Sequence, residues 1–187
     1  MAKFGSLNIN DTILKALRDN RLVVFAGAGV SMGNPSGLPS FVELAKEISK
    51  GTGIHLDKKE PVDRFLGNLQ YKGIDIKERA VEILTRPNSK PNSLHYDLLR
   101  LFRTKENIRL VTTNFDHHFE TAACDLFGEL PAVYRAPALP LGYDFDGIIY
   151  IHGSVTKPKD IVLTDADFGH AYLTEGWARR FLLDVLK

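Results

Sequence analysis

Short runs of apolar residues and segments with helical spacing follow one another along this chain. Residues 22–26 are continuously apolar, which suits a strand buried on both faces of a parallel sheet. Residues 108–113 and 147–153 show similar runs and are predicted to form two further strands. Residues 11–19 and 40–48 instead place apolar side chains three and four positions apart, which predicts amphipathic helices.

A helical insertion of about residues 55–105 separates the first two predicted strands. In its last segment Leu94, Leu98 and Leu101 fall on one helical face, so we expect this stripe to pack inward. The segments of the insertion that have helical spacing, with polar joints between them, are 61–69, 76–84 and 93–102.

The remaining pattern continues the alternation of strands and helices. Residues 115–127 have helical spacing ended by Gly128, and residues 175–187 form a helix-like tail. Residues 131–136 and 161–164 carry weaker strand patterns. This alternation predicts an α/β fold: a Rossmann-like, mostly parallel sheet with helices on both faces.

The composition is that of an ordinary globular protein. The chain has 187 residues, 44% of them apolar and 25% charged, with a formal net charge of +1. This balance gives no support to a broad nucleic-acid or membrane-binding surface. A single cysteine, Cys124, allows neither an internal disulfide nor a four-cysteine zinc site, so we expect a reducing compartment. Since the start has no secretory-signal pattern and no long apolar run occurs, the predicted location is cytoplasmic.

Three polar or glycine-rich segments stand where the predicted strands end. They are residues 27–31 (GAGVS), 113–116 (TNFD) and 152–154 (HGS). Ligands of open parallel sheets bind outside the carboxyl ends of the strands. We therefore predict that the three segments converge on one ligand site.

The glycine-rich segment suits an anionic ligand. Gly27 and Gly29 let backbone N–H groups come close to a phosphate, and a dinucleotide is a natural ligand of such a turn. The G-x-G-x-x-G fingerprint is incomplete because Met32 takes the place of its third glycine. A tight strand-to-helix turn without a ligand explains the glycines equally well.

The other two strand ends carry side chains suited to act on a ligand. Asn114 has donor and acceptor atoms for ribose hydroxyls or water, and Asp116 can accept from a carboxamide or hydroxyl. Taken alone, Asn114 is more often a helix cap. His152 can serve as a general base near neutral pH, with a buried core histidine as the alternative. The other five histidines are weaker candidates. We expect His117 and His118 to be surface or packing residues. Three others, His55, His95 and His170, have no acidic or cysteine neighbours at metal-site spacing.

Four motifs in order give the chain a resemblance to a known family. Gly27 begins GAGVS, Gly37 begins GLPSF, Thr112 begins TTNFD and His152 begins HG. Their order and wide spacing resemble the GAG-x-S, G-I-P-x-F, T-Q-N-x-D and H-G motifs of the sirtuin family. Residues 161–168 (IVLTDADF) are similar to the stretch after the histidine in bacterial SIR2-like proteins of antiphage defence.

The resemblance implies binding of NAD and cleavage of its nicotinamide–ribose bond. It implies that Asn114 contacts the nicotinamide ribose or orients a water molecule, and that Asp116 holds the nicotinamide carboxamide. His152 is the implied base for a ribose hydroxyl. The residues implied to line the NAD site are Gly27, Ala28, Gly29, Ser31, Leu38, Pro39, Phe41, Thr113, Asp116 and Gly153.

Departures from the family pattern narrow the implied activity. The chain lacks the four-cysteine zinc module of deacetylating sirtuins, so no zinc is expected. Ser40 and Val42 replace their acidic residue and arginine, and Thr113 replaces the glutamine of TQN. We therefore expect an NAD glycohydrolase that releases nicotinamide and ADP-ribose, or its cyclic form, in NAD-depleting antiphage defence. The alternatives are an NAD-dependent protein-lysine deacylase and an NAD- or ADP-ribose-binding or inactive structural subunit.

The C-terminal end also departs from the family. After the histidine strand the family has a further strand with a G-Y-S or G-T-S motif, and none occurs before Lys187. We therefore expect residues 1–187 to be the NAD-binding catalytic N-terminal part of a longer protein, with an incomplete sheet. By analogy with SIR2-like defence proteins, we expect homo-oligomers or a defence-system partner, nucleic acid only through that partner, and no membrane association.

Overall fold

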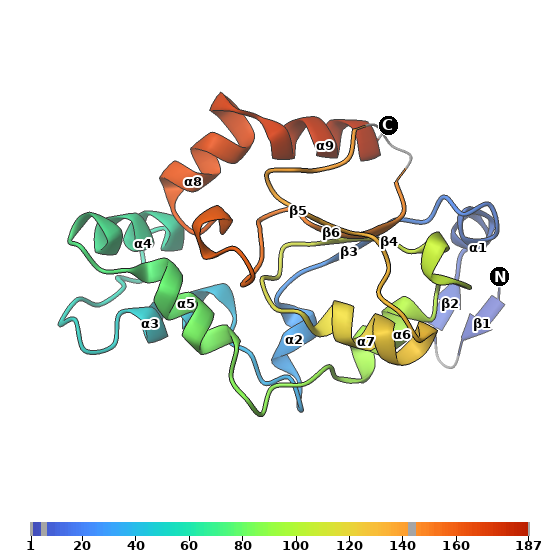
Figure 1. Cartoon of the computed structure of the whole chain (residues 1–187), viewed down its shortest axis with the longest axis horizontal. Helices are drawn as coiled ribbons and strands as arrows, with labels where there is room; N and C mark the ends of the chain where they lie inside the picture. The colour runs from blue at the N-terminus through green and yellow to red at the C-terminus, as the bar shows by residue number, and fades with distance from the viewer. Residues whose placement is uncertain (1, 5–6, 142–144, 187) are drawn as a thin grey trace.

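A sheet of four parallel strands forms the centre of the fold. The computed structural model describes residues 2–4, 7–141 and 145–186 (Figure 1). In spatial order the strands are β3 (Val24–Ala26), β4 (Arg109–Thr112), β6 (Gly147–Tyr150) and β5 (Val133–Arg135). Each neighbouring pair in this sheet runs parallel. The predicted Rossmann-like α/β fold is confirmed.

Helices cover both faces of the sheet (Figure 1). Leu110 and Ile148 pack toward one set of helices, whereas their neighbours Val111 and Ile149 pack toward the opposite set. All residues of β4 and β6 are buried, as expected for central strands covered on both faces. The covering helices are α6 (Ser93–Leu99) and α7 (His118–Phe127) on one face, and α9 (Trp177–Val185) on the other.

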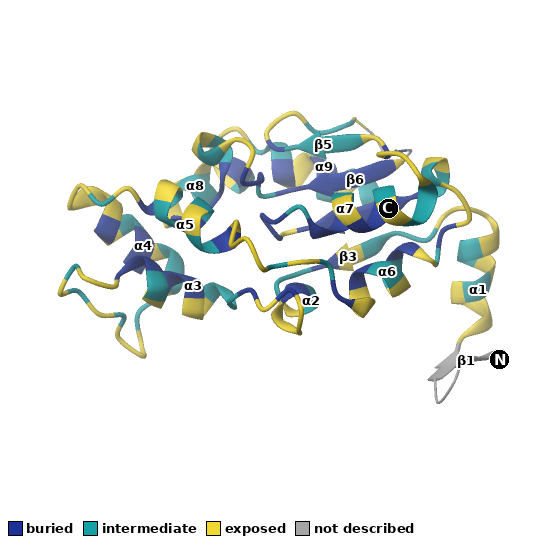
Figure 2. Cartoon of the chain, turned by 60° about the horizontal axis from the view of Figure 1, so that its bottom comes forward, coloured by how far each residue is buried: buried dark blue, intermediate teal, exposed yellow. Residues whose placement is uncertain are grey.

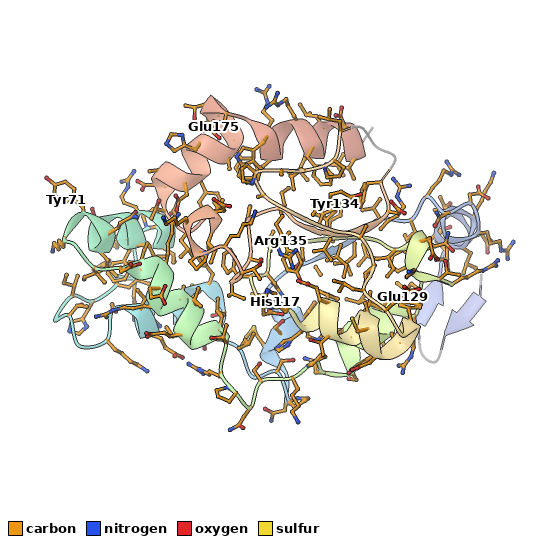
Figure 3. All side chains as sticks on the ribbon, in the orientation of Figure 1. Tyr71, His117, Glu129, Tyr134, Arg135 and Glu175 are labelled. Carbon is orange, nitrogen blue, oxygen red and sulfur yellow. The ribbon has the colours of Figure 1, made fainter. Side chains whose placement is uncertain are left out.

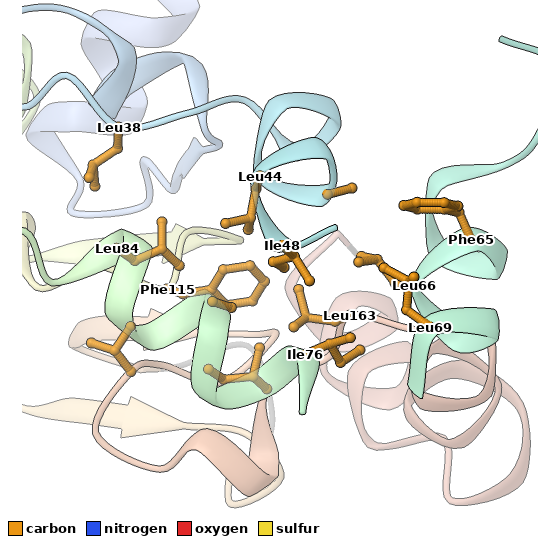
Figure 4. Close-up of a cluster of buried hydrophobic side chains, with 14 residues drawn as sticks. Leu38, Leu44, Ile48, Phe65, Leu66, Leu69, Ile76, Leu84, Phe115 and Leu163 are labelled. Carbon is orange, nitrogen blue, oxygen red and sulfur yellow. The ribbon is translucent and has the colours of Figure 1, made fainter. Parts of the chain in front are cut away.

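A second core lies beside the sheet, within and next to the helical insertion (Figure 4). Phe115 and Leu163 join it from loops that follow the sheet strands, so the insertion is packed directly against the carboxyl end of the sheet. The helices around this core are α3 (Phe41–Ile48), α4 (Val62–Tyr71) and α5 (Ile76–Leu84). Their buried side chains include Leu44, Ile48, Leu66, Leu69 and Ile76.

Side chains cap the starts of two of the predicted helices. Asn10 Oδ1 accepts a hydrogen bond from Thr12 N at the start of α1 (Asp11–Arg18). Ser40 Oγ accepts from Glu43 N, and the Glu43 carboxylate accepts in turn from Ser40 N. These bonds satisfy backbone donors that the first turn of a helix leaves without intrahelical partners.

The prediction of a strand at residues 161–164 is wrong. Ile161, Val162 and Leu163 are buried, but they lie in a loop beside the sheet. Val162 N donates to the carbonyl oxygen of His152, which holds this loop against the turn after β6. An apolar run predicts burial, and here the burial comes from packing without strand pairing.

The buried face of α6 also differs from the prediction. Leu94 is 44% exposed, whereas His95 and Leu99 are fully buried. Leu98 and Leu101 are only half-buried, and the helix ends at Leu99. The inward face is therefore shifted by one residue from the leucine stripe, and it carries a histidine.

Several short elements were not predicted, and some helices begin or end at other residues than predicted. Helix α7 begins at His118, not at residue 115, and α9 ends at Val185, while Lys187 of the predicted tail lies outside the described residues. The additional elements are an antiparallel pair β1 (Ala2–Phe4) and β2 (Leu7–Ile9), α2 (Gly29–Met32), single helical turns at Lys105–Asn107 and Pro158–Asp160, α8 (Asp165–Gly169) and a π-helical turn at His170–Thr174.

Burial follows this layered arrangement (Figure 2). Buried positions gather in β4, β6 and the inward sides of the covering helices, whereas α1 has no buried residue. Within the part of the chain that the structure describes, no helix is both long and apolar enough to cross a membrane.

Gly147 gives a test of the sheet geometry. It starts β6 with φ +109°, and a Cβ there would lie 2.1 Å from the carbonyl oxygen of Ala132. We expect Gly147→Ala to lower the free energy of unfolding by about 3 kcal/mol, measured by urea denaturation. Gly73→Ala is the matched control, since φ is +83° there but no described atom lies within 4 Å of the added Cβ. The control should cost only ~1 kcal/mol, and equal losses in both variants would contradict the described contact.

Candidate functional site

The carboxyl ends of β3, β4 and β6 open onto one cavity of ≈ 230 Å³. The predicted convergence of three strand ends is therefore observed. Sequence-predicted residues in its lining are Ala28, Ser31, Leu38, Pro39, Phe41, Thr113, Asn114, Asp116 and His152. The lining residues that were not predicted are Leu44, Leu84, Phe115, Val162 and Phe168. They come from α3, α5 and α8 and from the loops after β4 and β6, and they make most of the wall apolar.

Three predicted glycines lie outside the lining. Gly153 has φ +80°, and a Cβ there would come within 2.5 Å of the Asp160 carbonyl oxygen, so the turn after β6 requires glycine. A Cβ on Gly27 would make an ordinary contact of 3.4 Å with Thr113 Oγ1. A Cβ on Gly29 would meet no described atom within 4 Å. Packing within the described chain therefore does not explain the glycine at position 29.

Asn114 lies at the edge of the cavity, and its side-chain carbonyl oxygen accepts no hydrogen bond from the described residues. Its backbone N donates to Thr112 Oγ1 at 3.0 Å, and its Nδ2 donates to Ser31 Oγ at 3.1 Å. Asn114 is 5% exposed, and its buried Oδ1 has no hydrogen-bond partner among the described residues. The interpretation of Asn114 as a helix cap is wrong, because Asp116 Oδ1 instead accepts from His118 N at 3.0 Å.

Ser31 stands at the centre of the polar side of the site. Its hydroxyl donates to Asp116 Oδ2 at 2.9 Å and lies 3.2 Å from His95 Nε2. Together with Asn114 Nδ2 this gives Ser31 Oγ three partners in a fully buried position. A serine whose proton is donated to a carboxylate is not activated by the neighbouring histidine, so this group holds the site together and is not arranged as a nucleophile.

His95 is the functional-site contact that sequence reasoning missed. It comes from α6, in the insertion, and its ring contacts Phe119 with a centroid distance of 4.8 Å. Burial lowers the pKa of His95 to about 4, so the ring is neutral at pH 7. The available signal was the capping spacing of Asn92 and His95, which turns the histidine back toward the start of the helix.

His152 lies in the turn just beyond β6. Its Nε2 lies 2.8 Å from Tyr172 Oη, and its ring meets Phe168 edge-on at 5.2 Å between centroids. Burial lowers the pKa of His152 to about 4 and raises the pKa of Tyr172. The cavity is therefore lined by an imidazole that is neutral at pH 7 and has an acceptor nitrogen.

Arg135, labelled in Figure 3, forms an ion pair at the carboxyl end of the neighbouring strand β5. Arg135 donates from Nη2 to Glu120 Oε1 at 2.6 Å and from Nε to Ser154 Oγ at 2.9 Å. Its guanidinium also lies 5.4 Å from the ring centroid of Tyr150. Burial holds the pKa of Tyr150 well above its usual value, so the phenol stays neutral. These contacts lock β5 to β6 and α7 beside the cavity.

Residues 2–4, 7–141 and 145–186 contain no group of three or more histidine, cysteine, aspartate or glutamate side chains arranged to hold a metal ion. The polar side of the cavity is made of one carboxylate, one amide, hydroxyls and neutral imidazole. Such a set can hydrogen-bond a ligand and accept a proton from it.

Comparison with known proteins points to one family. Residues 108–187 match the family described as SIR2-like domain, and this span includes Asn114, Asp116 and His152. The chain is also 30% identical over 201 aligned positions to an uncharacterized protein, y4cA, of Sinorhizobium fredii. That alignment covers 95% of this chain and 16% of the relative, so the chain spans about a sixth of the length of the curated relative it matches. The domain match supports the SIR2-like resemblance and, since SIR2-like domains use NAD, an NAD-related function.

The buried neutral histidines give a prediction about stability and pH. His95 and His152 have pKa values of about 4 in the fold but about 6.5 in the unfolded chain. Below pH 6.5 the unfolded chain binds protons that the folded chain does not, so stability falls as the pH falls toward 4. We expect the urea midpoint to drop between pH 6.5 and 5. His152→Gln should show a smaller drop, and an undiminished one would contradict the lowered pKa.

Proposed function

We propose that this chain is the catalytic domain of an NAD glycohydrolase, which converts NAD and water to nicotinamide and ADP-ribose. The observation that carries the proposal is the Asn114 carbonyl oxygen, buried without a described partner in the cavity that His152 also lines. A buried acceptor without a partner costs about 1–3 kcal/mol, so its presence supports a ligand that donates to it. A ribose hydroxyl and a reacting water molecule are donors of this kind.

The cavity suits one end of the dinucleotide. Its ≈ 230 Å³ is below the roughly 300–1,000 Å³ of pockets that enclose a complete ligand. Apolar side chains such as Phe115 and Phe168 suit the flat nicotinamide ring, and Asp116 can accept from its carboxamide. The free space around Gly29 suits close approach of the phosphates to the backbone. The nicotinamide riboside end enters the cavity, and the phosphates lie at the glycine-rich segment.

In the proposed reaction the glycosidic bond is hydrolysed. The bond between the ribose carbon and the nicotinamide nitrogen breaks, and its electron pair moves to the nitrogen, so that neutral nicotinamide leaves. A water oxygen bonds to the same ribose carbon and gives up one proton. Asn114 Oδ1 orients this water or the ribose, and His152 accepts the proton and returns it to solvent. The apolar wall limits the access of other water molecules.

The proposed context is NAD depletion in antiphage defence, in the cytoplasm. The similarity of residues 161–168 to SIR2-like defence proteins supports it, and so do the missing zinc-binding cysteines and the replacements at Ser40 and Val42. In this proposal the chain acts within a homo-oligomer or with a partner of the defence system. Nucleic acid is sensed only through that partner.

The catalytic roles of Asn114 and His152 can be tested by nicotinamide release from NAD without any peptide. Because both side chains act on the reacting groups, we expect Asn114→Ala and His152→Ala each to lower turnover by about 100-fold or more. The matched control is His55→Ala, which removes an exposed histidine of the insertion and should leave turnover unchanged. Urea midpoints of all variants separate catalytic from structural loss.

Three results would overturn the proposal. Nicotinamide release that requires an acylated peptide would identify a deacylase. Binding of NAD by calorimetry without release would identify a binding module. A variant that loses stability but keeps its specific activity would remove that residue from the catalytic machinery.

A further inference from the structure

A chain of buried side chains joins the helical insertion to the cavity. Asn92 N donates to His95 Nδ1 at 3.2 Å, His95 Nε2 lies 3.2 Å from Ser31 Oγ, and Asn114 Nδ2 donates to Ser31 Oγ at 3.1 Å. None of these four residues is more than 5% exposed. The contacts connect α6, α2 and the turn after β4, which are distant in sequence.

The direction of each hydrogen bond follows from what the groups can donate. His95 Nδ1 lies near two groups of Asn92: the backbone N–H at 3.2 Å, which only donates, and the side-chain Oδ1 at 3.0 Å, which only accepts. The Ser31–Asp116 bond decides between them. The one hydroxyl proton of Ser31 goes to the Asp116 carboxylate, so His95 Nε2 is the donor to Ser31 Oγ and Nδ1 is the acceptor. A neutral imidazole that accepts at Nδ1 carries its proton on Nε2, and that proton points to Ser31 Oγ. Ser31 in turn donates its own proton to Asp116, which as a carboxylate can only accept.

This arrangement fixes the amide of Asn114. The Ser31 oxygen has already given its proton to Asp116, so it can offer only acceptor capacity to a further neighbour. The amide therefore presents Nδ2 to Ser31 and directs Oδ1 away from it. If the amide were turned over, Oδ1 would face an oxygen that has no proton to give. The unpartnered oxygen of Asn114 is thus a consequence of the bonds around Ser31.

The His95 ring is held in place from several sides. It packs edge-on against Phe119 at 4.8 Å and His118 at 5.3 Å between centroids. Asn92 fixes the start of α6 by donating from Nδ2 to the Val30 carbonyl at 2.7 Å and the Gly33 carbonyl at 3.2 Å. The donor at Nε2 is therefore pre-positioned for Ser31, and the insertion is bonded to the glycine-rich segment on which Ser31 lies.

We infer that His95 is a positioning residue: its Nε2–H donates to Ser31 Oγ, keeps the Ser31 proton directed to Asp116, and so holds Ser31 as the acceptor for the Asn114 amide. The effect of His95 on turnover rests on the proposed function, whereas its effect on the Asn114 amide does not. His95 touches neither the substrate nor the reacting atoms, so its loss should alter the use of bound NAD more than the binding of NAD.

Kinetics of two His95 variants test this role. His95→Leu removes the donor, and we expect kcat to fall about 10- to 100-fold while KM changes less than about 3-fold. His95→Gln can place an amide N–H near the former Nε2 and should bring kcat back to within about 5-fold of the parent chain. Phe119→Leu is the matched control, since it loosens packing on the same ring but leaves the donor. Equal kcat in the leucine and glutamine variants, or an equal loss in the control, would overturn the inference.

Nitrogen NMR of the side chains gives a readout that needs no activity. In the parent chain we expect His95 to carry its proton on Nε2, and we expect the Asn114 side-chain amide resonances to shift in His95→Leu but not in His95→Gln. A proton on His95 Nδ1 would overturn the inference even if NAD is hydrolysed. So would Asn114 side-chain resonances that keep the same chemical shifts in both variants. If NAD is not hydrolysed but both NMR results hold, the proposed function fails and the positioning role stands.

Discussion

Parallel pairing of β4 with β3 on one side and β6 on the other is the constraint on which the site depends. Ala26 is level with Thr112, and Thr112 is level with Tyr150, so the three strands end at the same edge of the sheet. The segments that begin there carry Ser31, Asn114 and His152 into one cavity. A slip of one residue in β4 would turn alternate side chains to the opposite face and remove Asn114 from Ser31.

Within that framework the polar groups of the site are almost free of charge. Burial keeps the imidazoles of His95 and His152 neutral, and the Asp116 carboxylate is satisfied by Ser31 Oγ and His118 N. Removing charges from water is costly unless each is paired or hydrogen-bonded. The site meets this requirement with one carboxylate and several neutral groups, and neutral imidazoles do not repel a cationic nicotinamide ring under the proposed function.

The sequence predicted the fold and most of the cavity because the relevant signals are local. Apolar runs gave the strands, and the polar residues that follow Ala26, Thr112 and Tyr150 are placed by strand ends alone. His95 could not be found this way, since its burial depends on how α6 rotates against α7 and Phe119. The loop at residues 161–164 was mistaken for a strand because an apolar run shows that a segment is buried, not what it pairs with.

The placement of the helical insertion between β3 and β4 has a consequence for folding. Val24 and Leu110 are neighbours in the sheet, although the whole insertion separates them in the chain. Bringing such distant segments together loses loop-closure entropy before any stabilising strand contact forms. Proteins rich in such long-range pairings therefore fold slowly. The segment between β3 and β4 has a core of its own around Leu44, Leu66 and Ile76, built largely from contacts within the stretch of chain that must close into a loop. Early formation of that core would shorten the effective loop, so the helices that line the cavity would also help the two strands to pair.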